Sequence, residues 1–369
     1  MKSYNHLYEK YIDPDNYRVA VHNATRRKNG KRKKRERAKR FRENSEKNMP
    51  ELLALAANFH NEKHTPRTIY DGISRKQRTI IIPSMREQVI HHMAVNVLKP
   101  IILGSMYEYS CGSLPGRGPH KARKRIERWI RHDPKHCKYV LQMDIRKFFD
   151  SIPHDKLKAL IASKIHDEKF LRVLFEIIDV QPVGLPLGFY TSQWLANWYL
   201  QGLDHFIKEK LGAAHYVRYM DDMVVFGSNK RELHRMKDEI ERYLWENLGL
   251  RLKSNWQVFR LEYTRAGKTR GRRLDFMGFQ FWRHRVTLRR SIMLKATRKA
   301  RRISKKPVTT IHDCRQMMAY LGWIDCTDTY NMYQKWIKPF VSFRAMRRRE
   351  SKFDRRQKLC GFTQKTAAA

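Results

Sequence analysis

The sequence is poor in several features that would indicate other classes of protein. It has 5 cysteines, an odd number without Cys-x-x-Cys spacing, so neither a disulfide framework nor a zinc ribbon is indicated. No apolar run approaches the length of a membrane-spanning helix, and the first residues do not have the pattern of a signal peptide. We therefore expect a cytoplasmic protein with no membrane partner.

Acidic residues are scarce relative to basic ones. The chain has 36 Asp+Glu against 78 Lys+Arg, a formal net charge of +42. Charge of this size repels itself unless a polyanion neutralises it, so nucleic acid is the expected partner. The densest basic run, 26–40, is too charged to form a core, and we predict a basic N-terminal RNA-binding extension over residues 1–48. A solvated helix face and a nuclear-localisation run are the alternatives for this segment.

Two of the few acidic residues, Asp221 and Asp222, separate two apolar runs, 216–218 and 223–226. This pattern predicts a β-hairpin with both carboxylates at its tip. Adjacent carboxylates in a partly buried site repel each other unless a cation lies nearby, and carboxylate oxygens suit Mg²⁺ or Mn²⁺. Taken alone, the pair could equally form an exposed turn.

Asp144 supplies a second acidic element, at the end of the apolar strand pattern 140–143. A two-metal phosphoryl-transfer site needs carboxylates from different parts of the chain, which converge on ions roughly 3.5–4 Å apart. Asp144 and Asp221 on adjacent strands of one sheet would meet this need.

These two acidic segments carry a resemblance to a known family. The run Asp144-Ile145-Arg146-Lys147-Phe148-Phe149-Asp150 and the box Tyr219-Met220-Asp221-Asp222 resemble the catalytic motifs of reverse transcriptases. The resemblance covers about residues 65–285, with the motifs in family order. It implies an α+β right-hand polymerase fold with fingers, an antiparallel-sheet palm that carries the aspartates, and a helical thumb.

The implied domains follow from the motif positions. Beyond the extension over 1–48, they are fingers over 49–136, a palm over 137–284 in which 155–200 includes helices and part of the fingers, and a helical basic thumb with a C-terminal tail over 285–369.

The resemblance also implies roles for the acidic residues. Asp144 and Asp221 would bind two Mg²⁺ ions, with Mn²⁺ as the alternative metal, while Asp222 supports the site and the backbone carbonyl of Ile145 joins the coordination. Lys253 is placed as a catalytic residue near the leaving pyrophosphate. An exposed lysine after a glycine turn is the alternative for Lys253.

Two residues are placed against the incoming dNTP by the same resemblance. Arg78 corresponds to the fingers residue that holds the triphosphate, with a strand-edge cation as the alternative. Phe149 corresponds to a bulky residue set against the 2′-oxygen of a ribonucleotide, which favours dNTPs, with core packing as the alternative.

The loop 184–193 subdivides the family. Most bacterial reverse transcriptases have Gln and Pro where this chain has Leu187 and Gln193. The pattern Leu187-Gly188-x-x-x-Ser192-Gln193 resembles the reverse transcriptases of diversity-generating retroelements, and it puts Leu187, Gly188 and Gln193 against the nascent base pair. That family implies copying of a template-repeat RNA into cDNA with errors opposite adenine, an RNA–DNA duplex product, diversification of a target gene, and an accessory variability protein oligomer as partner.

Three other functions remain as alternatives. They are a retron or phage-defence reverse transcriptase, a group II intron-type enzyme, and a non-catalytic RNA-binding protein with a relic palm. The Leu187 loop argues against the retron or defence class, and intact Asp144, Asp221 and Asp222 argue against the relic.

Three local predictions concern segments outside the catalytic motifs. Residues 155–178 are predicted to form one amphipathic helix. Residues 274–281, with Gly278 at the turn, are predicted to form a hairpin that resembles the primer grip. The tail after Met346 is predicted to be loosely ordered.

Overall fold

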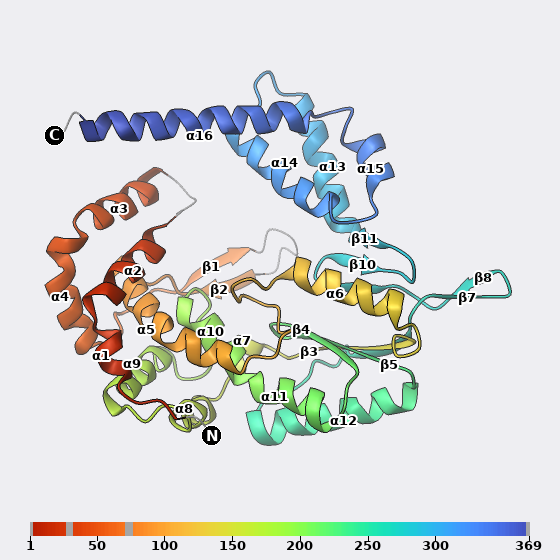
Figure 1. Cartoon of the computed structure of the whole chain (residues 1–369), viewed down its shortest axis with the longest axis horizontal. Helices are drawn as coiled ribbons and strands as arrows, with labels where there is room; N and C mark the ends of the chain where they lie inside the picture. The colour runs from red at the N-terminus through yellow and green to blue at the C-terminus, as the bar shows by residue number, and fades with distance from the viewer. Residues whose placement is uncertain (1–2, 27–31, 71–76, 367–369) are drawn as a thin grey trace. The chain divides into compact units, whose positions relative to one another are not determined.

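The computed structural model describes residues 3–26, 32–70 and 77–366, and the chain divides into two compact units (Figure 1). Unit 1 comprises residues 1–122 and 135–259, and unit 2 comprises residues 123–134 and 260–369. Part of the predicted basic extension, residues 27–31, lies outside the described residues.

The elements of unit 1 are α1 (Leu7–Tyr11), α2 (Pro14–Thr25), α3 (Arg32–Glu43), α4 (Ser45–Ala57), β1 (Arg67–Tyr70), β2 (Gln77–Ile80), α5 (Met85–Gly104), β3 (Tyr139–Asp144), α7 (Phe148–Ser151), α8 (His154–Ala162), α9 (Glu168–Ile178), α10 (Tyr190–Tyr199), α11 (Gln201–His205), the π-helix η1 (Phe206–Lys210), β4 (His215–Tyr219), β5 (Asp222–Gly227), α12 (Lys230–Leu248) and β6 (Gln257–Arg260), whose last residue enters unit 2. Those of unit 2 are β7 (Tyr263–Arg265), β8 (Lys268–Arg270), β9 (Leu274–Phe276), β10 (Phe279–Phe281), β11 (Val286–Leu288), α13 (Arg290–Ser304), α14 (Ile311–Ile324), α15 (Tyr330–Trp336) and α16 (Phe343–Thr366). Helix α6 (Pro119–His132) begins in unit 1 and continues into unit 2.

The centre of unit 1 is a four-stranded sheet in the order β4-β5-β3-β6. Strand β5 pairs antiparallel with both β3 and β4, and its interior residues 223–226 are all buried. A strand that is buried on both faces needs cover from both sides, and α12 packs against β3 and β5. The hairpin and the strand that ends at Asp144 are confirmed.

The first half of the predicted basic extension over 1–48 packs into unit 1, and only the run 26–40 was expected to stay out of a core. Tyr11 in α1 and Tyr17, Ala20 and Ala24 in α2 are buried in the core of unit 1, and α2 packs against α5. The spacing of these apolar residues of α2 places them on one helix face, which the surrounding basic residues obscure in the sequence.

Residues 155–178 form two helices, α8 and α9, so the prediction of one continuous helix is wrong. Asp167 is the reason for the break: its carboxylate accepts the backbone N–H of Phe170 at 3.1 Å and so caps α9. The same carboxylate accepts the N–H groups of Leu7 and Tyr8 at 2.8 Å, which joins α1 to this corner.

Unit 2 contains the predicted hairpin of residues 274–281. Strands β9 and β10 pair antiparallel, with Met277 and Gly278 in the turn at positive φ of 52° and 86°. Two central residues at positive φ are typical of a tight type I′ hairpin turn. Strand β11 pairs with the other edge of β10.

The prediction of a loose tail after Met346 is wrong for the described residues, because α16 continues to Thr366. Helix α16 packs against α14, and Arg315 of α14 pairs with Glu350 at 3.1 Å and with Asp354 at 2.7 Å. These ion pairs join residues far apart in the sequence, so the local pattern after Met346 does not reveal the helix.

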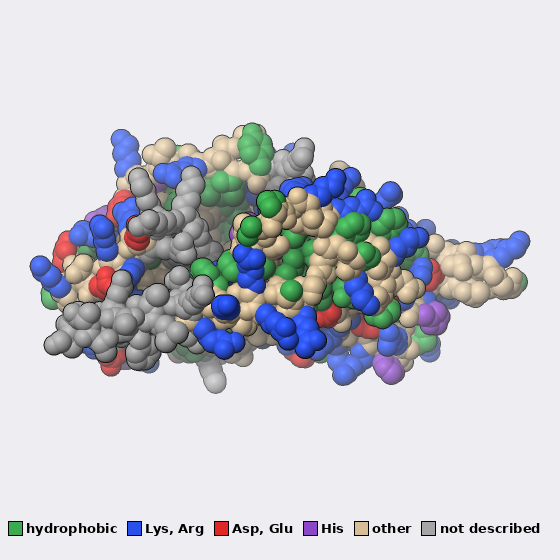
Figure 2. Space-filling model, turned by 90° about the horizontal axis from the view of Figure 1, so that it is seen from above, with side chains coloured by type: hydrophobic (Ala, Val, Ile, Leu, Met, Phe, Trp, Pro, Cys, Tyr) green, Lys and Arg blue, Asp and Glu red, His purple; other side chains and the backbone are tan. Residues whose placement is uncertain are grey.

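The surface agrees with the composition. On the face that Figure 2 presents, Lys and Arg side chains are widely spread and Asp and Glu side chains are few. Within the described residues, no helix combines the length and the apolar character needed to cross a membrane.

Candidate active site

The sheet of unit 1 brings Asp144, Asp221 and Asp222 to one end. Asp144 is the last residue of β3 and lies opposite Asp222, the first residue of β5. Asp221 occupies the turn between β4 and β5, and its carbonyl accepts the N–H of Ile145 at 3.4 Å. Two segments far apart in sequence therefore present their carboxylates together.

The turn itself is tight. Tyr219 pairs with Asp222, so the β4–β5 loop contains only Met220 and Asp221. Met220 has a positive φ of 56°, a conformation in which glycine is usual at this hairpin position. A non-glycine residue in this region costs on the order of 1–3 kcal/mol and persists where its surroundings hold it.

The electrostatics of the aspartates are unusual. Burial and the negative charges of Asp144 and Asp222 raise the pKa of Asp221 well above its ordinary value. The Nζ of Lys253 forms an ion pair with Oδ2 of Asp144, and the backbone N–H of Lys253 donates to the Asp144 carbonyl at 2.8 Å. The other carboxylate oxygen of Asp144, Oδ1, is buried and has no hydrogen-bond partner among the described residues.

These residues fit a hard divalent cation. A buried carboxylate oxygen without a donor and a neighbouring carboxyl group that resists ionisation are both relieved by positive charge. Oxygen donors are those that Mg²⁺ and Mn²⁺ prefer. Within the described residues, no three His, Cys, Asp or Glu side chains gather in an arrangement that could hold a metal. The fit therefore rests on the pair Asp144 and Asp221, with Asp222 beside them.

The loop 184–193 connects the site to the β1–β2 hairpin. The carbonyl of Leu187 accepts the N–H of Ile81 at 2.8 Å, just beyond β2. At its other end, the N–H of Leu185 donates to the Phe149 carbonyl at 2.7 Å. The loop thus has backbone contacts to the segments that carry Arg78 and Phe149.

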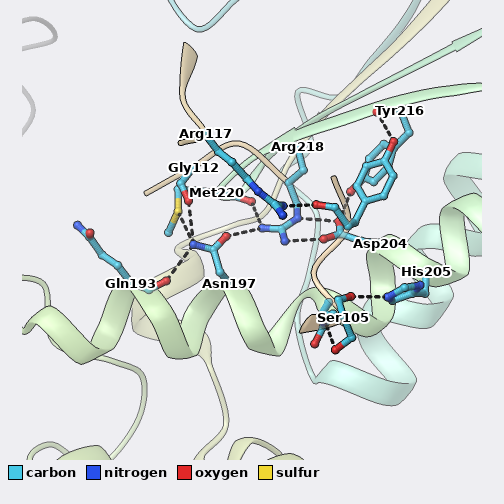
Figure 3. Close-up of polar contacts among 12 residues, drawn as sticks. Ser105, Gly112, Arg117, Gln193, Asn197, Asp204, His205, Tyr216, Arg218 and Met220 are labelled. Carbon is cyan, nitrogen blue, oxygen red and sulfur yellow. Dashed lines mark hydrogen bonds and ion pairs between the residues drawn. The ribbon is translucent and has the colours of Figure 1, made fainter. Parts of the chain in front are cut away.

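The remaining predicted site residues occupy different settings. Arg78 is exposed in β2, opposite Ile69, and Phe149 is half-buried against Phe148. Gln193 is exposed in the first turn of α10, and in Figure 3 its side chain points away from Asn197.

Sequence reasoning missed the polar cluster behind the turn, formed by Asn197, Asp204 and Arg218 (Figure 3). All three side chains are buried. Arg218 lies inside a run that otherwise has the pattern of an apolar strand. A charged residue in such a run is the feature of the sequence that could have indicated a buried polar partner.

Comparison with known proteins identifies the family of this chain. The family model of reverse transcriptase (RNA-dependent DNA polymerase) matches residues 62–281, which include every predicted site residue. The chain belongs to the reverse transcriptase family, and it carries the domain of an RNA-directed DNA polymerase.

Its relatives include intron and retron proteins. An uncharacterised 91 kDa protein in the cob intron of Schizosaccharomyces pombe is 34% identical over 38% of this chain and 18% of that protein. The group II intron-encoded protein LtrA of Lactococcus lactis is 29% identical over 36% of this chain and 23% of that protein. The retron Ec73 reverse transcriptase of Escherichia coli is 27% identical over 35% of this chain and 45% of that protein. The chain thus spans less than half of each of these relatives.

Among solved structures, the telomerase of Candida tropicalis in complex with a fragment of telomeric RNA is similar at 13% identity and a TM-score of 0.49, over 74% of this chain and 54% of that chain. With the family established, the helices and the antiparallel sheet that presents the aspartates are those of the α+β right-hand polymerase fold. That prediction is confirmed. Reverse transcriptase domains in general use divalent metal ions.

Proposed function

We propose that this chain is an RNA-directed DNA polymerase that extends a DNA primer on an RNA template with dNTPs. The observation that supports this most is the meeting of Asp144 and Asp221 at one sheet end inside a reverse transcriptase domain. The charge of +42 supports template RNA and an RNA–DNA duplex as partners.

The proposed chemistry assigns each residue a part. Asp144 and Asp221 hold two Mg²⁺ ions, with Asp222 and the Ile145 carbonyl as further oxygen donors. When bound, the ions supply charge stabilisation for the attacking and leaving oxygens. Lys253 lies beside Asp144 and contributes positive charge, or a proton, near the leaving pyrophosphate.

Nucleotide binding falls to residues around the loop 184–193. Arg78 holds the incoming triphosphate, and Phe149 selects against a 2′-hydroxyl. The backbone contacts of the loop to both segments support this assignment, because they keep Phe149 and the strand of Arg78 in fixed relation to Leu187 and Gly188.

For the biological role, we propose mutagenic copying of a template-repeat RNA in a diversity-generating retroelement, with an accessory variability protein oligomer as partner and the cytoplasm as the place of action. Leu187 is the residue that favours it. Glutamine can hydrogen-bond near the base pair or sugar, whereas leucine cannot, so a check on pairing geometry is relaxed.

A second candidate is a group II intron-type or retron reverse transcriptase. The observation in its favour is that the curated relatives include intron-encoded proteins and a retron enzyme.

One assay separates these roles. The purified chain is given a defined RNA template, an annealed DNA primer, Mg²⁺ and dNTPs, and the cDNA is sequenced at every template base. We expect errors concentrated at template adenines, and we expect Leu187→Gln to reduce them. Faithful cDNA from the natural chain would favour the intron or retron role.

The control for the chemistry is Asp221→Asn, which keeps the size of the side chain but removes its charge. We expect extension to fall by at least about a thousandfold, as for loss of a group in direct contact with the reacting centre. RNA affinity and the melting temperature should stay near those of the natural chain. Extension that survives this substitution would overturn the assignment of Asp221.

A further inference from the structure

A fully buried ion pair between Arg218 and Asp204 lies beside Met220, the residue that precedes Asp221 (Figure 3). The side chains of Arg218 and Asp204 are both 0% exposed. Arg218 Nε donates to Asp204 Oδ1 at 2.7 Å, and Nη2 donates to Oδ2 at 2.6 Å. A buried ion pair generally stabilises a fold no better than apolar residues of the same volume, so its place in the molecule requires another reason.

The remaining nitrogen of the guanidinium group supplies that reason. Arg218 Nη1 donates to the Met220 carbonyl at 3.0 Å and to Asn197 Oδ1 at 3.1 Å. Met220 immediately precedes Asp221 and has the strained positive φ of the turn. The bond from Arg218 therefore fixes the peptide group that leads into Asp221.

Asn197 holds the same residue from a second direction. Its Nδ2 donates to the Gly112 carbonyl at 2.9 Å and to the Gln193 carbonyl at 3.0 Å, and it lies 3.4 Å from Met220 Sδ. Gly112 packs so closely that a Cβ there would lie 2.6 Å from the Met220 nitrogen. Asn197 thus joins the start of α10 to the turn.

The main chain of Arg218 is held as well. Its carbonyl accepts the N–H of Cys111 at 2.7 Å, and its N–H donates to the Tyr109 carbonyl at 3.0 Å. The Arg218 side chain is therefore held at both ends, by its backbone and by Asp204.

We propose that Arg218 and Asn197 are positioning residues: Arg218 holds the Met220 carbonyl, and Asn197 holds Arg218 Nη1 and contacts the Met220 sulfur. Together they aim the Asp221 carboxylate at Asp144, so that the metal site is formed before metal or substrate arrives. Asp204 acts one step further back, because it holds Arg218. The inference rests on the proposed function in taking Asp144 and Asp221 as metal ligands. Groups that orient metal ligands commonly affect metal affinity 10–100-fold when lost.

The experiment uses the full chain with three substitutions. Arg218→Lys keeps a positive charge for Asp204, but a single ammonium group cannot replace the fork that also reaches Asn197 and Met220. Asn197→Ala removes the second set of contacts and serves if the lysine variant does not fold. Tyr216→Phe is the matched control, because it removes a buried 2.8 Å bond from Tyr216 Oη to Asp204 Oδ1 at the end of the cluster that does not touch Met220.

Three quantities are measured: the melting temperature, binding of Mn²⁺ followed by its electron paramagnetic resonance signal without nucleic acid, and the rate of primer extension against Mg²⁺ concentration. We expect Arg218→Lys and Asn197→Ala to weaken Mn²⁺ binding about tenfold and to raise the half-saturating Mg²⁺ by a similar factor, with the KM for dNTP little changed. Tyr216→Phe should bind Mn²⁺ as the natural chain does.

The inference would be overturned if Arg218→Lys and Asn197→Ala left Mn²⁺ binding and Mg²⁺ dependence unchanged and lost activity only in proportion to the folded fraction. The inference would also be overturned if Tyr216→Phe weakened Mn²⁺ binding as much as the other two substitutions do. If the natural chain fails to extend any primer while the expected Mn²⁺ pattern holds, the proposed function fails and the positioning role stands.

Discussion

Gly188 lies where the loop 184–193 meets the end of β2. Its φ is +118°, a region that side chains rarely adopt, and a Cβ at this position would lie 2.1 Å from the Ile81 carbonyl oxygen. The neighbouring bond from Ile81 N–H to the Leu187 carbonyl depends on this close approach. Glycine is therefore required at 188 for a backbone reason, whatever its part in nucleotide binding.

We expect Gly188→Ala to lower the free energy of unfolding by about 1–3 kcal/mol, the usual cost of a disallowed backbone conformation. The rate of primer extension should fall by more than the loss of folded protein explains, because the loop 184–193 shifts relative to β2. The measurement pairs thermal melting with the extension rate. Gly104→Ala is the control, since a Cβ at the end of α5 would meet no atom of the described residues within 4 Å. An alanine at 188 that melts like the natural chain would contradict the argument.

Single residues differ in how far the sequence alone reveals them. Asp221 and Asp222 were predictable because a charged pair between two apolar runs indicates a hairpin tip, and because Asp144 at a strand end supplies a second acidic element. Asn197, Asp204 and Arg218 were not, because their partners lie on three different elements and no local spacing encodes the contact.

At the scale of elements, the start of α14 depends on one buried acid. Asp313 accepts the Nζ groups of Lys299 and Lys306, each at 2.7 Å, and forms a capping box with Thr310. Burial opposes ionisation of Asp313, but the hydrogen bonds from Lys299, Lys306 and Thr310 outweigh it and hold the pKa of Asp313 far below its ordinary value. This carboxylate therefore joins α13 to α14.

A folded-state pKa below the unfolded one stabilises the fold above the unfolded pKa, and the contribution is lost as pH falls. We expect Asp313→Asn to destabilise unit 2 by about 1.5–3 kcal/mol at pH 7, the worth of hydrogen bonds to a charged group. The difference from the natural chain should shrink below about pH 4, where the unfolded carboxylate protonates. Melting curves from pH 2 to 8 test this, with Asp325→Asn at the exposed end of α14 as control. A difference that is constant with pH would exclude the charge as its cause.

Elements were predictable where periodicity is strong and local. The palm strands and the hairpin with Gly278 follow from alternation and turn residues, as predicted. The break between α8 and α9 was not predicted, because Asp167 accepts backbone N–H groups of both α1 and α9, and the contact with α1 is far away in sequence. Helix α16 was missed for the same physical reason, since its stabilising ion pairs reach across to Arg315.

At the scale of the whole molecule, the charge of +42 is an argument about partners and not about fold. Helix α13 illustrates the difference, because Ile292, Ala296 and Ala300 on one face are buried while Arg298 and Arg302 are exposed. The buried face fixes the helix in unit 2, and the exposed arginines remain available to phosphates.

Binding of an RNA–DNA duplex should therefore depend steeply on salt, with the logarithm of affinity falling linearly against the logarithm of salt concentration. Each lost phosphate contact lowers that slope by about 1, so we expect the double substitution Arg298→Ala with Arg302→Ala to lower it by about 2. The control is the double substitution Arg18→Ala with Arg315→Ala, which removes the same charge. Each of these arginines is already held by two carboxylates: Arg18 by Asp15 and Glu46, and Arg315 by Glu350 and Asp354. Titrations from 50 to about 300 mM salt measure both slopes. Equal slopes for the two double variants would mean that only net charge matters and that α13 makes no phosphate contact of its own.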